Sequence, residues 1–172
     1  LARLVTTVDH VSGGRVELGM GAGWYEREHR EAGIPFPDAR TRFDLLAEQL
    51  EVIVRSWTEE AFDHTGAAYT LAAQTALPRP VQAPRPPLIL GGTAKRRGAG
   101  LAARWASEYN SLGAPLPELH ERRARLDAAC AEVGRDPETL PLSLMTTCVI
   151  GNDRAAIEER LQTARAIAVE SR

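Results

Sequence analysis

The chain has 172 residues, and its 21 Lys and Arg residues nearly balance 23 Asp and Glu residues, for a formal net charge of −2. This length allows one domain with a buried core. The charge balance argues against a nucleic-acid partner, and no apolar run approaches the ~18 residues of a membrane span. The two cysteines, Cys130 and Cys148, lack metal-ligand spacing. We therefore expect a cytoplasmic globular protein with two buried, reduced thiols, no metal site, and neither a nucleic acid nor a membrane as partner.

The first 24 residues predict a helix, a strand and a glycine-rich exit. A helix over residues 1–10 buries an apolar stripe with i, i+3, i+4, i+7 spacing, formed by Leu1, Leu4, Val5 and Val8. Ser12-Gly13-Gly14 is a turn signal, and residues 15–19 form a short strand. The glycine-rich residues 19–24 follow at the carboxyl end of the strand. Ligands of parallel α/β proteins lie at such strand ends, so this exit is a candidate binding segment.

The glycine-rich exit matches neither of two familiar nucleotide-binding motifs. A dinucleotide fingerprint needs a third glycine or alanine where Trp24 or Glu26 stands, and a P-loop needs a Gly-Lys-Ser/Thr that is absent here. From the glycines alone, a turn that binds nothing stays an equal alternative.

The middle of the chain predicts helices and a long connection. A short helix over residues 26–32 ends at Gly33, and Asp38 or Thr41 caps a helix over residues 39–57. The apolar face of this second helix comprises Phe43, Leu46, Leu50, Ile53, Val54 and Trp57. Residues 59–87 have little periodicity. Within them, residues 62–64 and 69–71 pair as a hairpin, and the proline-rich residues 78–87 are extended and exposed.

The second half alternates strands and helices. Residues 88–90 form a strand buried on both faces, followed by Gly91-Gly92-Thr93, with Thr93 as the N-cap of a helix that runs to about residue 107. Its buried residues are Leu101, Ala102, Trp105 and Ala106. A strand over 108–111, a helix over 117–133 and a strand over 142–150 follow. Asp153 caps the final helix, whose apolar face is Ile157, Leu161, Ala164 and Ala168. This alternation predicts parallel βαβ units.

Two long motifs resemble one family. Residues 8–24, with Ser12-Gly13-Gly14-Arg15 and the glycine-rich exit, and residues 80–92, with the prolines before Gly91-Gly92, are similar to segments of the luciferase-like flavin or deazaflavin oxidoreductases. The resemblance runs through nearly the whole chain and implies an α/β fold, the luciferase-like (β/α)8 TIM barrel. A complete barrel needs ~250 residues. We therefore expect residues 1–172 to form a single, incomplete barrel domain of about four βα units, with residues 59–87 as a hairpin-bearing insertion. About three strands would precede Leu1, and about one strand with the closing helices would follow Arg172.

Gly91-Gly92-Thr93 is the best candidate for an anion site, because it joins a strand to a helix start. Backbone N–H groups and the helix dipole favour a phosphate there, and the neighbouring basic residues are Lys95, Arg96 and Arg97. An ordinary turn with solvated basic side chains is the alternative. The resemblance implies that the phosphate of a cofactor binds at this turn.

The same resemblance implies the rest of the cofactor site. Gly21, Ala22 and Gly23 would lie near the cofactor ring, and Trp24 and Tyr25 would either wall the pocket or pack in the core. Asn110 and Ser111, at the end of the next strand, would hydrogen-bond phosphate or ribityl groups. His29, near Glu26 and Glu28, is a candidate for proton transfer, with a surface helix histidine as the alternative. No catalytic residue carries over from the family.

The resemblance implies hydride transfer or monooxygenation of a small organic substrate with coenzyme F420 or reduced FMN, whose ring carries the redox chemistry. One alternative is a truncated, non-catalytic or flavin-binding remnant. Such an open half-barrel would aggregate or form a homodimer. Another alternative is a complete doubly wound domain that binds a different phosphate ligand.

Overall fold

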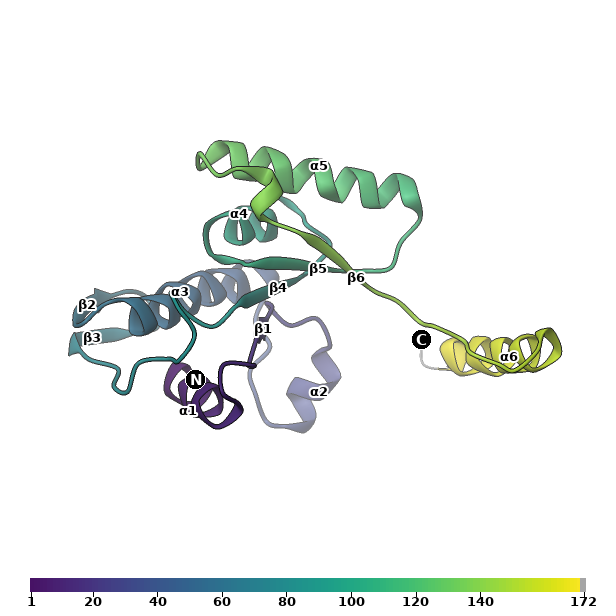
Figure 1. The fold of residues 1–172 in the computed structure, drawn as a ribbon, viewed down its shortest axis with the longest axis horizontal. Coiled ribbons are helices and arrows are strands. Elements are labelled where there is room, and N and C mark those ends of the chain that lie inside the picture. The colour runs from purple at the N-terminus through teal and green to yellow at the C-terminus, as the bar shows by residue number, and fades with distance from the viewer. Residues whose placement is uncertain (171–172) are drawn as a thin grey trace.

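The computed structural model describes the backbone of residues 1–170 and the side chains of residues 1–166. Its main sheet has four parallel strands, β1 (Leu18–Met20), β4 (Leu88–Gly92), β5 (Glu108–Leu112) and β6 (Leu142–Met145), which lie side by side in chain order (Figure 1). This order lacks the reversal of a doubly wound sheet. The sheet is instead an arc of the kind that an incomplete (β/α)8 barrel contains, as the sequence predicts.

Three helices cover one face of the sheet. They are α3 (Ala39–Thr58), α4 (Arg96–Trp105) and α5 (Leu116–Glu132), and α4 contacts α3, α5 and β4. The core between these layers includes Leu50, Leu88, Leu90, Tyr109, Leu126 and Cys130. The remaining helices are α1 (Ala2–Ser12), α2 (Glu26–Glu31), a 3-10 turn (Pro137–Thr139) and α6 (Arg154–Glu170). None of the helices in residues 1–170 is long and apolar enough to span a membrane.

The helix predicted over residues 39–57 is confirmed in position and in its buried face. The Asp38 carboxylate accepts a hydrogen bond from the Thr41 backbone N–H at 2.9 Å, which caps α3. The predicted apolar residues Leu46, Leu50, Ile53, Val54 and Trp57 are all buried, and Phe43 is half-buried. Local capping and helical periodicity therefore determine this element.

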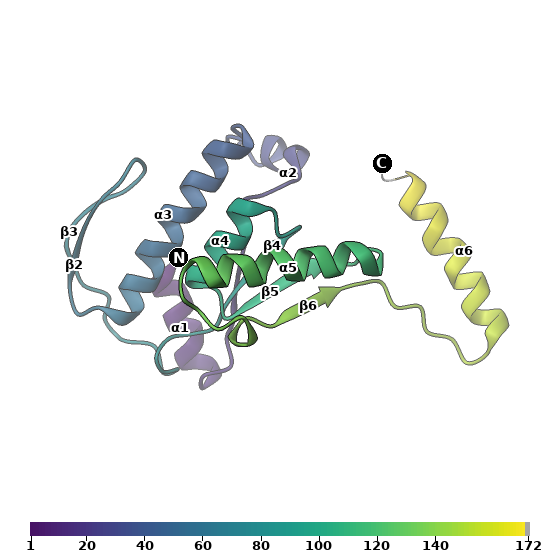
Figure 2. The same cartoon turned by 90° about the horizontal axis from the view of Figure 1, so that it is seen from above.

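The predicted hairpin is also present. Strands β2 (Phe62–Thr65) and β3 (Thr70–Gln74) pair in antiparallel fashion and lie beside α3 (Figure 2). Glu48 of α3 holds the hairpin, because its carboxylate accepts hydrogen bonds from the backbone N–H groups of Ala68 and Tyr69.

The predicted apolar face of the first helix is wrong. Leu1, Leu4 and Val8 are 64%, 64% and 43% exposed, and Val5 alone of that stripe is buried. The helix instead turns a partly polar face inward, with Thr6 and Asp9 buried beside Val5. The reason lies far along the chain, because the Asp9 carboxylate accepts hydrogen bonds from the proline-rich segment.

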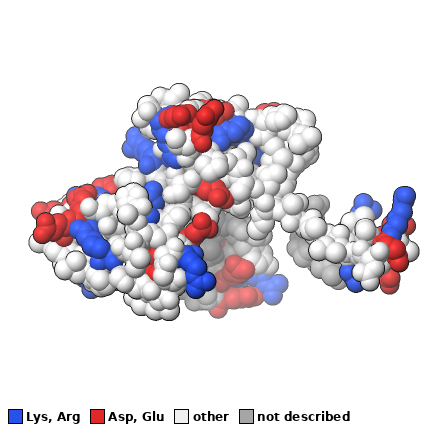
Figure 3. Space-filling view, in the orientation of Figure 1, with Lys and Arg blue, Asp and Glu red and all other residues white. Residues whose placement is uncertain are grey.

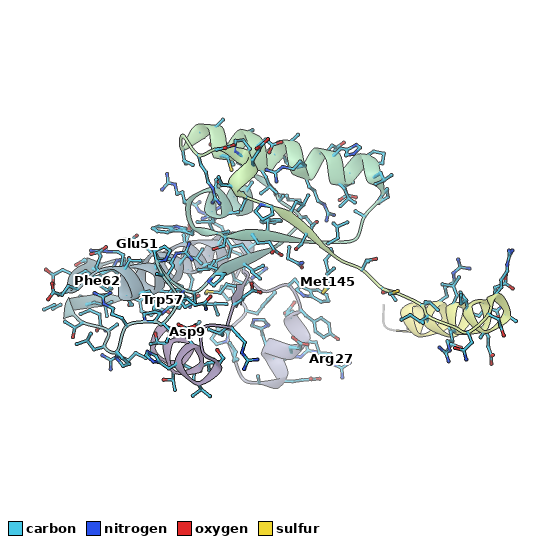
Figure 4. The ribbon with its side chains drawn as sticks, in the orientation of Figure 1. Asp9, Arg27, Glu51, Trp57, Phe62 and Met145 are labelled. Atoms are coloured by element: carbon cyan, nitrogen blue, oxygen red, sulfur yellow. The ribbon has the colours of Figure 1, made fainter. Side chains whose placement is uncertain are left out.

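The proline-rich segment is therefore less exposed than predicted. Asp9 accepts hydrogen bonds from the backbone N–H groups of Val81 and Gln82, and Pro86 is fully buried. Trp57 adds a second link to α1, because its indole N–H donates to the Ala2 carbonyl at 3.2 Å. Figure 4 labels Asp9 and Trp57, which lie in neighbouring parts of α1 and α3.

The strand limits follow from pairing rather than from local sequence. β1 begins at Leu18, not Arg15, where it meets Leu88 of β4. β6 ends at Met145, opposite the last residue of β5, so the predicted strand over 142–150 is too long. The residues that follow form an uncharged connection (Figure 3).

α6 stands apart from the sheet in both ribbon views (Figures 1 and 2). Its N-cap is confirmed, because Asp153 accepts a hydrogen bond from the Ala156 N–H at 2.9 Å. Its predicted apolar face is not covered, since Ile157 and Leu161 are each 37% exposed. Ala164 is half-buried, and the side chain of Ala168 lies outside the described residues. Cys130 is buried as predicted, whereas Cys148, in the connection before α6, is exposed.

Candidate functional site

A cavity of about 1090 Å³ lies at the carboxyl ends of the parallel strands. Two glycine-bearing segments line it, the exit segment (Gly21, Ala22, Gly23 and Trp24) after β1 and the turn segment (Gly91, Gly92 and Thr93) at the end of β4. Asn110 of β5 lines it as well. Of the residues predicted to bind the cofactor at the two glycine-bearing segments and the end of β5, the cavity brings together all except one.

The exception is Ser111. Its side chain is fully buried on the opposite face of the sheet, where the hydroxyl accepts a hydrogen bond from Arg122 of α5 at 2.5 Å. Successive side chains of a strand point to opposite faces, so Asn110 and Ser111 could not both face one cavity. This alternation was a signal that the sequence already contained.

The exit segment is held from α3 by Arg42. Its Nε donates to the Ala22 carbonyl at 3.1 Å, a second nitrogen donates to the Pro37 carbonyl, and its guanidinium lies 3.8 Å from the centre of the Phe36 ring. Gly23 has a φ of +76°, and a Cβ there would lie 3.2 Å from the His29 imidazole. The segment thus requires glycine for its backbone conformation, and its position is set by a side chain from α3.

Tyr109 of β5 fixes the backbone that follows the turn segment through a hydrogen bond. The Ala94 N–H donates to the Tyr109 hydroxyl at 2.7 Å, and burial raises the pKa of this phenol. Gly92 has a φ of +145°, and a Cβ on it would lie 3.1 Å from the same hydroxyl. The guanidinium of Arg125 in α5 donates hydrogen bonds to the carbonyl oxygens of Ala94 and Thr93, at 2.9 and 3.3 Å. The turn is therefore rigid, and its close approach to Tyr109 requires glycine.

Thr93 is not the N-cap of α4. The chain stays in β4 to Gly92 and turns through Ala94, whose φ is +48°, so that Lys95 becomes the N-cap residue. No side chain in the described part of the chain caps this helix end. The first backbone N–H groups of α4 lack intrahelical partners, and Arg96, Arg97 and Gly98 line the cavity. This end of the cavity is suited to an anion.

Charge reinforces that preference. The cavity lining contains the cations Arg40, Lys95, Arg96 and Arg97, and the one carboxylate among its described residues is Asp44. Arg97 is held by Asp44 and by the Arg40 carbonyl, whereas Lys95 and Arg96 have no ion-pair partner among the described side chains. Leu112 and Met145, which are partners in the register of β5 and β6, form an apolar wall, and Figure 4 shows Met145 at the end of β6. Phe43 adds apolar surface beside Arg97, whose guanidinium lies 5.6 Å from the centre of the Phe43 ring. The cavity therefore has one cationic end and one apolar wall.

His29 has a supporting role in the structure. Its Nδ1 lies 3.0 Å from the Tyr25 carbonyl and its ring packs against Phe36, with centroids 4.7 Å apart. It is not among the residues that line the cavity, so its geometry favours the surface-helix alternative. Trp24 does line the cavity, yet it is 84% exposed and tilts against Tyr25.

Sequence reasoning missed Arg42, Tyr109 and Arg125. Each contacts a backbone group distant in sequence, from 15 residues for Tyr109 to 32 for Arg125. No local pattern marks such contacts. Among the described residues, no group of three or more His, Cys, Asp or Glu side chains is arranged to hold a metal ion.

Comparison with known proteins identifies the family. The model of the luciferase-like monooxygenases matches residues 1–171. An FMNH2-dependent dimethylsulfone monooxygenase of Pseudomonas putida is 29% identical over 131 residues, which cover 74% of this chain and 36% of that protein. A dibenzothiophene-sulfone monooxygenase of Rhodococcus erythropolis is 27% identical over 184 residues, covering 94% of this chain and 40% of that protein.

A solved structure shares the fold. The coenzyme F420-dependent tetrahydromethanopterin reductase of Methanopyrus kandleri superposes with a TM-score of 0.78 at 20% identity, over 90% of this chain and 47% of that chain. This chain thus spans less than half the length of each of these three proteins. Because the family model matches almost every residue, the chain belongs to the luciferase-like monooxygenase family.

Proposed function

We propose that this chain binds a flavin or deazaflavin cofactor in the cavity at the strand ends and belongs to an oxidoreductase that acts on a small organic substrate. The observation that carries the proposal is the cavity itself, which joins a cationic turn to an apolar wall across two glycine-bearing segments. In this proposal residues 1–172 act as one domain, and residues 59–87 are an insertion in it.

The cationic end suits a phosphate. The turn segment and the start of α4 present backbone N–H groups, and Lys95 and Arg96 add charge without an ion-pair partner among the described residues. Tyr109 and Arg125 hold the turn in place before any ligand binds. Such preorganisation lowers the entropic cost of binding.

The apolar wall suits a flat ring. Gly21, Ala22 and Gly23 present bare or nearly bare backbone, and Phe43, Leu112 and Met145 supply apolar surface. When bound, a flavin or deazaflavin supplies the hydride or, with molecular oxygen, the oxygenating chemistry. The residues of this chain orient the ring and exclude water from one of its sides.

Two cofactors satisfy this chemistry. FMN and coenzyme F420 both combine a tricyclic ring, a ribityl chain and a phosphate, so the same cavity accommodates either. One relative is named as FMNH2-dependent and one structural neighbour as F420-dependent, which supports the class.

Calorimetric titration with FMN, riboflavin and coenzyme F420 tests the proposal. The wild-type chain should bind FMN or coenzyme F420. Arg96→Glu should weaken binding of FMN by about tenfold, because it removes one charge-assisted contact, and should leave riboflavin, which lacks the phosphate, unchanged. Arg104→Glu is the matched control, since Arg104 is an exposed arginine of the same helix outside this cavity. Absence of binding to all three compounds would refute the proposal.

A further inference from the structure

Three polar side chains form a hydrogen-bonded row on the face of the sheet opposite α4 and α5. Ser143 of β6 donates from its hydroxyl to the Glu108 carboxylate, and the Asn110 side-chain amide donates to the Ser143 hydroxyl at 2.8 Å. Asn110 and Ser143 are direct partners in the register of β5 and β6. All three side chains are half-buried, so the row is a fixed feature of the sheet.

The row has a defined direction. A carboxylate only accepts hydrogen bonds, and a serine hydroxyl has a single proton to donate. The Ser143 proton is directed to Glu108, so the Ser143 oxygen must accept from Asn110. The amide of Asn110 is therefore oriented with its NH2 group toward Ser143 and its carbonyl oxygen Oδ1 away from it.

This orientation determines what Asn110 offers to the cavity that it lines. Its Oδ1 has no hydrogen-bond partner among the described residues. A free carbonyl oxygen attracts an O–H or N–H donor and disfavours a phosphate, whose oxygens are acceptors.

We infer that Asn110 recognises a donor group of the ligand, a polyol hydroxyl or a ring N–H, and that Ser143 and Glu108 are positioning residues that orient its amide. This inference rests on the proposed function. The sequence predicts that Asn110 contacts either the phosphate or the ribityl groups of the cofactor. The orientation of its amide favours the groups that donate hydrogen bonds, and the phosphate then binds at the turn segment and the start of α4.

A double-mutant cycle tests the inference through the affinities for FMN and riboflavin. Asn110→Ala should weaken both by about fivefold, the effect of one neutral hydrogen bond. Ser143→Ala should weaken both by a similar or smaller factor. The double variant should be no weaker than Asn110→Ala, because Ser143 acts through Asn110. Ser143→Thr keeps the hydroxyl and should restore wild-type affinity. If coenzyme F420 binds instead of FMN, the same cycle is run with F420 and the corresponding deazariboflavin.

Three results would overturn the inference. Asn110→Ala that weakens FMN but not riboflavin would assign Asn110 to the phosphate. Multiplicative effects of the two substitutions would mean that Ser143 does not act through Asn110. A wild-type chain that binds no flavin or deazaflavin would refute the proposed function and this inference with it, a failure distinct from the other two. Thermal melting checks folding, and if Asn110→Ala does not fold, the pair Ser143→Ala and Ser143→Thr decides.

Discussion

The buried carboxylate of Asp9 should contribute strongly to stability. It accepts hydrogen bonds from the Val81 N–H at 2.6 Å, the Gln82 N–H at 3.0 Å and the Gln82 side-chain amide at 2.8 Å. Burial alone would raise its pKa, but the hydrogen bonds from Gln82 and Val81 outweigh burial and lower the pKa of Asp9. The same Gln82 amide also donates to the Val16 carbonyl at 2.8 Å. Asp9 thus joins α1 to the segments before β1 and β4.

Asp9→Asn turns one of the two acceptor oxygens into a donor. If the new NH2 group faces the backbone, it meets the N–H groups of Val81 and Gln82. If it faces the Gln82 side chain, that amide must rotate and lose its bond to Val16. Either arrangement costs at least one bond to a charged group and leaves a buried donor or acceptor unpaired, about 2–3 kcal/mol. For a chain of this size the melting temperature should fall by about 5–10 °C.

Thermal and urea unfolding of wild type, Asp9→Asn and Glu17→Gln measures this cost. Glu17 is exposed and makes no side-chain hydrogen bond within the described residues, so the control removes the same charge at little cost. Because the pKa of Asp9 is lowered in the folded state, its contribution is present above the unfolded value of about 3.9 and is lost as pH falls through the folded pKa. A difference below about 0.5 kcal/mol at neutral pH, or one that does not shrink below about pH 4, would refute this reasoning.

Further outcomes follow from the turn and the thiols. Gly92→Ala should destabilise the fold by about 1–3 kcal/mol, because the φ of Gly92 is +145° and the new Cβ would lie 3.1 Å from the Tyr109 hydroxyl. Gly100→Ala in α4 should instead stabilise the fold by about 0.5–1 kcal/mol, because the new Cβ would have no neighbouring atom within 4 Å outside its own helix backbone. Equal melting temperatures for the two variants would contradict this. Tyr109→Phe should remove the tyrosine that ionises above the usual range in an ultraviolet pH titration, since burial raises its pKa; an unchanged titration would show that another tyrosine is responsible. Cys148 should react at once with a thiol reagent and Cys130 only on unfolding, and two fast thiols would contradict the burial of Cys130.

Local signals in the sequence were sufficient for much of the fold. Asp38 and the periodic apolar residues after it predict α3, since capping and periodicity act within a few residues of each other. The glycines at the ends of β1 and β4 predict the two segments that line the cavity. The alternation of strands and helices predicts the parallel sheet.

Tertiary contacts decided the rest. The inward face of α1 depends on hydrogen bonds between Asp9 and the backbone of Val81 and Gln82, which follow it by 72 and 73 residues. The end of β6 at Met145 depends on the end of its partner strand β5 at Leu112. The start of α4 shifts beyond Thr93 because Tyr109 binds the turn. The orientation of Asn110 is set by Ser143, 33 residues later. Sequence patterns report interactions between near neighbours along the chain, whereas each of these features is set by hydrogen bonds between segments that only the folded sheet brings together.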